Sequence, residues 1–262
     1  MVKEFKNTGY WAVILGGSSG LGLASAKKLA AHGMNIIIVH RNPRVEMEAI
    51  EAEFEAIRSY DVDFMAFNTD ALNAEKRGEI ISGIKNITGD GAVRCLLHSI
   101  AKGNLKAMAG DDALQNTDLQ ITLNAMAFSL YDWVKVLVDE NLFAKDARII
   151  SFTSEGSSRA WQHYAAVSAA KAALEAITRN IALEFAPFGL RANCIMAGVT
   201  DTPSLRMIPG HDELAAYAIK RNPFKMLTKP EDVANAVYLL CKEEAAWITG
   251  AVIPVNGGEH LQ

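Results

Sequence analysis

The chain has 262 residues, of which 50% are hydrophobic and 21% charged, with a formal net charge of -4. That length suits one large α/β domain with a sizeable core, or two small domains, and the composition excludes a fibrous or disordered chain. Because acidic and basic residues are mixed along the sequence, we expect no nucleic-acid partner.

Cysteine usage and the absence of targeting signals point to an intracellular protein. Cys95, Cys194 and Cys241 lie far apart in apolar segments, so we expect buried free thiols and no metal site or disulfide. No N-terminal segment has the order of a targeting peptide, and no uncharged run is long enough to cross a bilayer. We therefore expect a soluble, cytoplasmic protein with no membrane partner.

Short apolar runs of strand length alternate with longer segments of helical periodicity. The runs are 10–15, 35–40, 64–68, 93–99, 147–153, 190–196 and 251–255. This alternation is typical of parallel strands joined by crossover helices. It predicts an α/β fold in which residues 1–262 form a single doubly wound domain around a seven-stranded parallel sheet.

Helices and loops are predicted from the segments between these strands. Helical periodicity covers residues 21–33, 44–59, 117–140, 163–186 and 230–242. Two stretches, 100–116 and 198–229, read as irregular. Each follows the C-terminal end of a strand, which is where open α/β sheets bind ligands.

The stretch "ILGGSSGLGLASA" places Gly16, Gly20 and Gly22 between the first strand and the first helix. Glycine permits positive φ and has no Cβ, so the backbone can approach a pyrophosphate held at the positive helix N-terminus. A plain tight turn is the alternative. The strand, turn and helix context favours a dinucleotide site.

This turn resembles the Thr-Gly-x-x-x-Gly-x-Gly signature of the short-chain dehydrogenase/reductase family, with Leu15 where threonine is usual. The resemblance extends over nearly the whole chain. "NTDA" (68–71) is similar to the family's adenine-contacting step, Asn124 to its structural asparagine, and "ITGAVIPVNGG" (248–258) to its last strand. The resemblance implies a Rossmann domain, a nicotinamide cofactor, a substrate lid after the sixth strand, and a homotetramer.

The resemblance also implies a set of cofactor-binding residues. They are Gly16, Ser18, Ser19, Gly20, Leu21, Gly22, His40, Arg41, Asp70, Ala71, Ser99, Ile100, Ala101, Lys171, Ala197, Gly198, Val199, Thr200 and Thr202.

The end of the second strand indicates which nucleotide is preferred. An acidic residue there would bind both ribose hydroxyls, whereas a basic residue would pair with a 2′-phosphate. His40 is followed by Arg41, with Arg44 near, so we expect NADPH in preference to NADH. The alternative is that Arg41 is a solvated surface residue.

The position of the tyrosine departs from the family's usual pattern. Most members carry the catalytic tyrosine four residues before the lysine, and that position before Lys171 is Val167. Tyr164 lies seven residues before Lys171, which is about two helical turns, so both side chains share one face.

The Tyr-x6-Lys spacing resembles the enoyl-acyl-carrier-protein reductases, and their NADPH-dependent branch most of all. "HSIA" (98–101) and Ala197-Gly198 agree with that resemblance. It implies hydride transfer to Cβ of a trans-2-enoyl thioester in fatty acid biosynthesis. The acyl group would be carried by an acyl carrier protein or by coenzyme A.

Roles for three side chains follow from the chemistry of such a thioester. Hydride at Cβ places negative charge on the thioester oxygen, so a phenol aimed there stabilises the enolate. We assign this hydrogen bond to Tyr164, and to Lys171 the nicotinamide ribose and a nearby positive charge. Ser154 either hydrogen-bonds the substrate or caps the strand end. His98 and His163 are interpreted as packed or solvated histidines.

The segment after the sixth strand mixes apolar residues with turn formers, and we expect Leu205, Met207 and Ile208 to line an acyl chain. Five basic residues near it would suit an acidic carrier protein, unless they are only a solvated face. They are Arg206, Lys220, Arg221, Lys225 and Lys229.

Two other functions remain open. A repositioned Tyr164 would also serve a short-chain carbonyl oxidoreductase acting on 3-oxoacyl compounds or alcohols. The departures at Leu15 and Val167 would suit a catalytically silent NADP-binding sensor.

Overall fold

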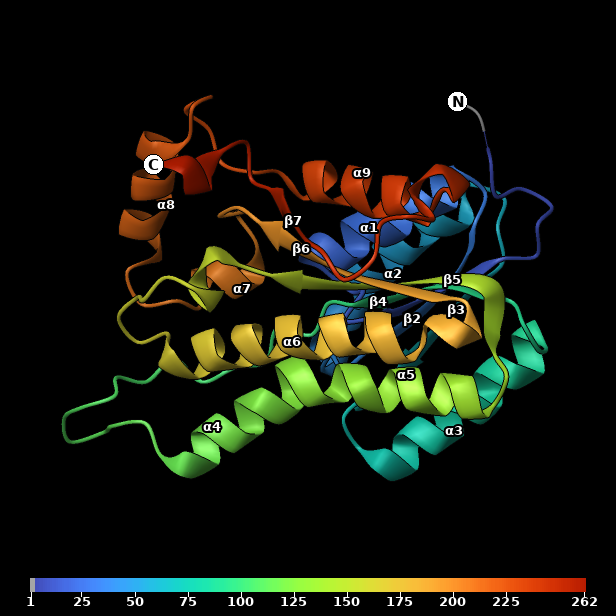
Figure 1. The fold of residues 1–262 in the computed structure, drawn as a ribbon, viewed down its shortest axis with the longest axis horizontal. Coiled ribbons are helices and arrows are strands. Elements are labelled where there is room, and N and C mark those ends of the chain that lie inside the picture. Colours follow the sequence, from blue (N-terminus) through green and yellow to red (C-terminus); the bar gives the residue numbers. More distant parts are fainter. Residues whose placement is uncertain (1–2) are drawn as a thin grey trace.

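The computed structural model of the protein describes residues 3–262, which contain one seven-stranded parallel sheet (Figure 1). The strands are β1 (Trp11–Leu15), β2 (Asn35–His40), β3 (Phe64–Asn68), β4 (Val93–His98), β5 (Phe143–Thr153), β6 (Leu190–Ala197) and β7 (Val252–Val255). Their order is β3-β2-β1-β4-β5-β6-β7, so the chain winds outward in both directions from β1 and β4. This topology confirms the predicted doubly wound domain.

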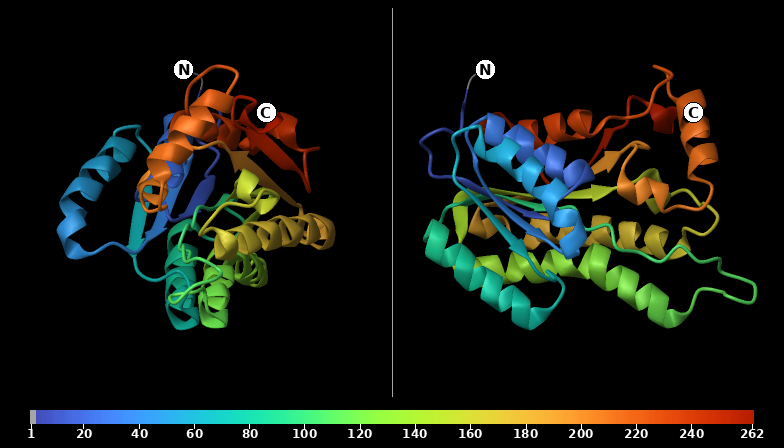
Figure 2. Two further views of the ribbon diagram at one scale, coloured as in Figure 1. Left: turned by 90° about the vertical axis from the view of Figure 1, so that its left-hand side faces the viewer. Right: turned by 180° about the vertical axis from the view of Figure 1, so that it is seen from behind.

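Helices cover both faces of the sheet, as Figures 1 and 2 show. One layer consists of α1 (Gly20–Ala31), α2 (Met47–Arg58) and α9 (Pro230–Cys241). The other consists of α3 (Ala74–Thr88), α4 (Asn116–Leu123), α5 (Ser129–Asp139) and α6 (Ala165–Glu184). The thiols of all three cysteines are free and buried in this sandwich, as predicted.

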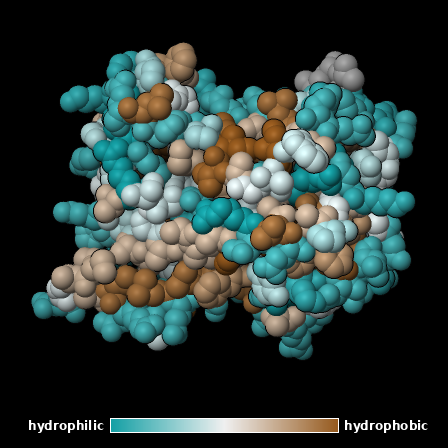
Figure 3. All heavy atoms as spheres, in the orientation of Figure 1, coloured by the Kyte–Doolittle hydropathy of each residue, from teal (hydrophilic) through white to brown (hydrophobic). Residues whose placement is uncertain are grey.

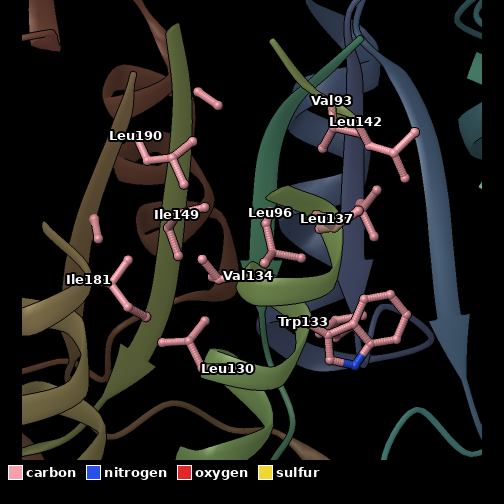
Figure 4. Packing of buried hydrophobic residues seen from close by; sticks show 14 of the residues in the cluster. Val93, Leu96, Leu130, Trp133, Val134, Leu137, Leu142, Ile149, Ile181 and Leu190 are labelled. Atoms are coloured by element: carbon pink, nitrogen blue, oxygen red, sulfur yellow. The ribbon is translucent and has the colours of Figure 1, made fainter. Parts of the chain in front are cut away.

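Alternation along the strands divides the core into two clusters. In β1, Val13 and Leu15 face one cluster, and Ala12 and Ile14 face the other. Figure 4 shows the first cluster, where side chains of α5 such as Trp133 pack against the strands. Burying each large aliphatic side chain contributes roughly 1.5–3 kcal/mol, so both faces of the sheet stabilise the fold.

Two expectations differ from the structure. Residues 198–229 are not irregular, because they contain α7 (Pro203–Arg206) and α8 (His211–Arg221). Acidic residues in the first turn of α8 and basic residues in its last turn complement the helix dipole, a signal that Pro209-Gly210 obscured. The sequence reading also omitted α3, whose two internal glycines weaken its helical pattern.

The predicted helix 117–140 is one helical run, Asn116–Asp139, with a π-helical turn at η2 (Asn124–Phe128) between α4 and α5. By length and composition this run could cross a membrane, but half of its most apolar window is buried within the protein. It packs on α6 as a core helix does. The family asparagine, Asn124, begins the π-helical turn, a feature that is frequent at functional sites.

Candidate active site

A cleft of about 850 Å³ opens at the carboxyl ends of the strands. The glycine-rich turn, the ends of β2, β4 and β5, the N-terminus of α6 and the segment from β6 to α8 surround it. Of the predicted site residues, all except Gly22 line this cleft, including Tyr164, Lys171 and Ser154. Leu205, Met207 and Ile208 of the predicted lid line it as well.

The glycine-rich turn is built as a dinucleotide site requires. Gly16 has a φ of +83°, and a Cβ there would lie 2.6 Å from the Ser99 carbonyl oxygen. A Cβ on Gly22 would lie 2.3 Å from the Gly16 carbonyl oxygen, so this glycine serves close packing rather than direct contact with a cofactor. Ser19 begins α1 without a side-chain cap, which leaves backbone N–H groups free for an anion.

Arg41 is held at the end of β2 by an ion pair. Its Nη1 donates to Asp70 Oδ2 at 2.8 Å, while Asp70 Oδ1 accepts from the Leu72 backbone N–H at 2.9 Å. Arg41 and Asp70 both line the cleft, and the Arg41 side chain is 58% exposed. Arg44 is exposed in η1 (Arg44–Glu46) and does not line the cleft.

His40 is buried beside this pair. Its Nδ1 lies 2.9 Å from Asn42 Oδ1, and burial lowers the pKa of the imidazole. The ring is therefore neutral at neutral pH. It places a polar but uncharged group next to Arg41.

Tyr164 is the N-cap residue of α6, and its half-buried side chain lines the cleft wall. Its ring packs against the backbone after β5, because a Cβ on Gly156 would lie 2.5 Å from Cε1 of the ring. Burial raises the pKa of the phenol, and the nearby Ser154 hydroxyl offsets part of that rise. The phenol therefore keeps its proton at neutral pH and can donate a hydrogen bond.

The Ser154 hydroxyl is buried and faces the Tyr164 phenol, whose pKa it lowers. It precedes η3 (Glu155–Ser157) as the N-cap residue but does not cap that turn. Of the two predicted roles, capping the strand end is therefore wrong. Because Ser154 and Tyr164 both line the cleft, their two hydroxyls can contact the same ligand.

Lys171 is buried at 9% exposure, and its Nζ donates to the Phe152 carbonyl at 2.7 Å. Burial lowers the pKa of this ammonium from 10.5 to about 8, although Cys194 and Glu175 oppose the shift. Lys171 is thus mostly charged at neutral pH while enclosed in the cleft.

Val167 occupies the position where a phenol is usual, and hydrocarbon surrounds it. It packs with Met126 and Ala170, and Tyr164 borders the same cluster. A Cβ on Gly103 would lie only 2.7 Å from Val167 Cγ2, so the loop after β4 closes directly over this side chain. The site therefore offers Tyr164 as its phenol, and position 167 presents only an aliphatic side chain to the cleft.

His98 is a packed residue, as predicted. Its Nε2 lies 2.7 Å from Ser129 Oγ, and Ser129 Oγ donates to the Ala125 carbonyl in the π-helical turn. Burial and the charge of Lys171 lower the pKa of His98 to about 3. It is therefore neutral and does not take up a second proton near pH 7.

The five basic residues near the lid do not form one free surface. Arg221 is buried at 5% exposure, so the prediction that it faces an acidic carrier is wrong. Arg206 pairs with Asp201. Other residues that line the cleft, among them Glu155, Tyr217 and Glu259, were not predicted, because nothing in their local sequence pattern marks them.

A family profile described as enoyl-(acyl carrier protein) reductase matches residues 16–260. The 7alpha-hydroxysteroid dehydrogenase of Paraclostridium sordellii is 27% identical over 95% of this chain and 91% of its own length. The enoyl-[acyl-carrier-protein] reductase (NADH) of Aquifex aeolicus is 25% identical, with a TM-score of 0.85 over 97% of both chains. FabI of Candidatus Liberibacter asiaticus has a TM-score of 0.86 at 21% identity, covering 100% of this chain and 98% of its own.

Proposed function

The chain belongs to the short-chain dehydrogenase/reductase family of oxidoreductases, and on that premise we propose that it is an NADPH-dependent enoyl thioester reductase. The observation that carries this proposal is the pair of positions 164 and 167. The half-buried phenol of Tyr164 lines the cleft seven residues before Lys171, and valine occupies the position of the usual phenol. The family profile and the Aquifex aeolicus enzyme, both described as enoyl reductases, support it.

The residues of the cleft suit both the cofactor and the reaction. NADPH, when bound, supplies hydride to Cβ of the enoyl thioester. The glycine-rich turn would receive its pyrophosphate, where a Cβ on Gly16 would block the approach. Tyr164 donates its hydrogen bond to the thioester oxygen, where negative charge develops. Lys171 holds the nicotinamide ribose and adds positive charge near that oxygen.

The preference for NADPH rests on Arg41. A guanidinium pairs with a phosphate through charge-assisted, bidentate hydrogen bonds. Arg41 is fixed at the end of β2 by Asp70, at the place where a 2′-phosphate would lie. We therefore propose NADPH here, although the enzyme from Aquifex aeolicus is described with NADH.

A carbonyl reductase is the second candidate. The Paraclostridium sordellii relative is described as a 7alpha-hydroxysteroid dehydrogenase, and the Ser154 hydroxyl beside Tyr164 would suit a carbonyl oxygen. In that chemistry the phenol and the hydride act on one C–O bond. The seven-residue spacing places the phenol further from Lys171 than such enzymes have it.

A third candidate, a silent NADP-binding sensor, keeps the cofactor site without the reaction. The intact set of Tyr164, Lys171 and Asn124 disfavours it.

The proposal is tested with purified protein, NADPH and a short trans-2-enoyl thioester, with a 3-oxoacyl thioester in parallel. We expect loss of nicotinamide absorbance with the enoyl substrate alone. Oxidation with the 3-oxoacyl substrate alone would establish the carbonyl reductase instead. NADPH binding without turnover of either substrate would establish the sensor.

We also propose a cytoplasmic homotetramer that takes its acyl group from a carrier protein or coenzyme A. Figure 3 shows apolar side chains along the face where Figure 1 draws α4, α5 and α6. Exposed residues there and in the following turn support a contact between copies: Ile121, Phe128, Tyr131, Leu183 and Phe188. Analytical ultracentrifugation tests the tetramer.

A further inference from the structure

Arg221, the last residue of α8, is a buried arginine between two carboxylates from distant parts of the chain. Its Nη2 donates to Glu155 Oε2 at 2.6 Å and to the Glu259 carbonyl at 2.9 Å. The Glu259 carboxylate lies 3.6 Å from the same nitrogen. Glu155 is 66 residues before Arg221, and Glu259 is 38 residues after it. One guanidinium thus joins three segments around the cleft.

The Glu155 end of this bridge belongs to the segment that carries the substrate-facing groups. Glu155 lies between Ser154 and Gly156, whose backbone packs against the Tyr164 ring. Ser168 of α6 also donates to the Gly156 carbonyl. Any displacement of Glu155 therefore moves the Ser154 hydroxyl and the surface on which the phenol rests.

A second arginine reinforces this end. Arg159 Nη1 donates to the other Glu155 oxygen at 3.0 Å, and its Nη2 donates to the Tyr217 hydroxyl at 3.1 Å. Tyr217 belongs to α8, and its ring lies 5.3 Å from the Arg221 guanidinium. The helix of the lid is thereby held to the catalytic segment at two points, one turn apart.

The Glu259 end contacts residues 197–202, which contain predicted cofactor-binding residues and are called the nicotinamide segment, because Thr202 is expected at the nicotinamide end of the cofactor. Glu259 Oε2 accepts from the Val199 backbone N–H at 3.2 Å, and a Cβ on Gly198 would lie 2.9 Å from that oxygen. Glu259 is only 5% exposed, and burial raises the pKa of its carboxyl. The position of the backbone after β6 is thus tied to the same guanidinium.

The pairing of Arg221 with Glu155 and Glu259 is not explained by its contribution to the stability of the fold. Nε and Nη1 of Arg221 are buried and make no hydrogen bond within residues 3–262. Buried donors without partners are destabilising, and buried ion pairs are often replaceable by apolar side chains without loss of stability. Because the bridge is not accounted for by stability alone, a role in the reaction is the better explanation of its geometry.

We propose that Arg221 is a positioning residue that closes α8 over the cleft and fixes the Tyr164 segment relative to the nicotinamide segment. The inference rests on the proposed function only in placing a nicotinamide-dependent reduction in this cleft. Because Glu155 and Glu259 pair with the same guanidinium, closure of α8 also sets the distance between the hydride donor and the hydride acceptor.

The test compares R221K, which keeps the charge but cannot bridge both carboxylates, with R58K. Arg58 is a matched control, since it also binds two carboxylates, Glu51 and Glu55, and lies over an aromatic ring, but on α2. We expect R221K to lower kcat on the order of 10²-fold, with the affinity for NADPH nearly unchanged. The kinetic isotope effect with deuterated NADPH should rise, because hydride transfer becomes limiting. The proposal would be overturned if the isotope effect of R221K were unchanged. It would also be overturned if the fall in kcat matched the fraction of R221K that is unfolded.

Hydrogen–deuterium exchange decides the question without turnover. In R221K, amide exchange should increase at 155–164 and 197–202 as well as at 211–221, while R58K should match the wild type. Faster exchange at 211–221 alone would overturn the proposal. E155Q weakens the same bridge from its other end and serves if R221K does not fold. If the wild type reduces no substrate, the proposed function fails, and the exchange pattern still decides the role of Arg221.

Discussion

Burial of Lys171 makes a specific prediction about stability and pH. Because its pKa is about 8 in the folded chain and 10.5 without burial, the unfolded chain binds the proton more strongly between these values. Stability therefore rises with pH across this window. From pH 7 to pH 9.5 this one group contributes a rise of about 2 kcal/mol, at about 1.36 kcal/mol for each pKa unit.

The K171M variant removes this dependence. We expect the free energy of unfolding of K171M, relative to the wild type, to fall by about 2 kcal/mol between pH 7 and pH 9.5. Below pH 8 the variant is stabilised relative to the wild type because it buries no charged group at position 171. At every pH it is destabilised by the loss of the hydrogen bond to the Phe152 carbonyl. Its NADPH oxidation should be lost throughout.

Urea unfolding of both proteins without cofactor, at the two pH values, measures the difference. Lys85 provides the control, because its exposed ammonium pairs with Glu140, which raises its pKa. K85M should therefore show no such fall. A difference between K171M and the wild type that is constant with pH would refute the argument that burial controls the charge of Lys171.

Three further predictions concern single side chains. Y164F should lower kcat on an enoyl thioester by about 10²–10³-fold, as loss of one oxyanion donor does, while fluorescence titration should show unchanged NADPH binding. R41M should weaken NADPH binding by roughly 10–100-fold and leave NADH binding unaffected, since a charge-assisted hydrogen bond to phosphate contributes about 1.5–3 kcal/mol. Equal losses of affinity for both nucleotides would exclude a contact between Arg41 and the 2′-phosphate. G103A should lower the free energy of unfolding by about 1–3 kcal/mol through the contact with Val167, whereas G78A, with nothing within 4 Å of the new Cβ, should not.

The sequence predicted those parts of the site that depend on local order along the chain. Local sequence patterns alone mark three features: the glycines between β1 and α1, the residues that end β2, and the spacing of Tyr164 and Lys171. Parallel topology then brings the strand ends to one edge.

Contacts between distant segments were not predictable in this way. The bridge of Glu155, Arg221 and Glu259 joins residues 66 and 38 positions apart, and in sequence Arg221 is one more basic residue near a lid. The ion pair of Arg41 with Asp70 likewise depends on the pairing of β2 with β3. Such partners are defined only by the folded chain.

The central claim is that hydride is delivered to Cβ of an enoyl thioester, and the position of deuterium in the product tests it most directly. The protein is incubated with a trans-2-enoyl thioester and NADPH carrying two deuterium atoms at C4. We predict a saturated thioester with one deuterium at Cβ, located by mass spectrometry and NMR. The claim is contradicted if no saturated product forms while a 3-oxoacyl thioester yields a 3-hydroxy product with deuterium on its carbinol carbon.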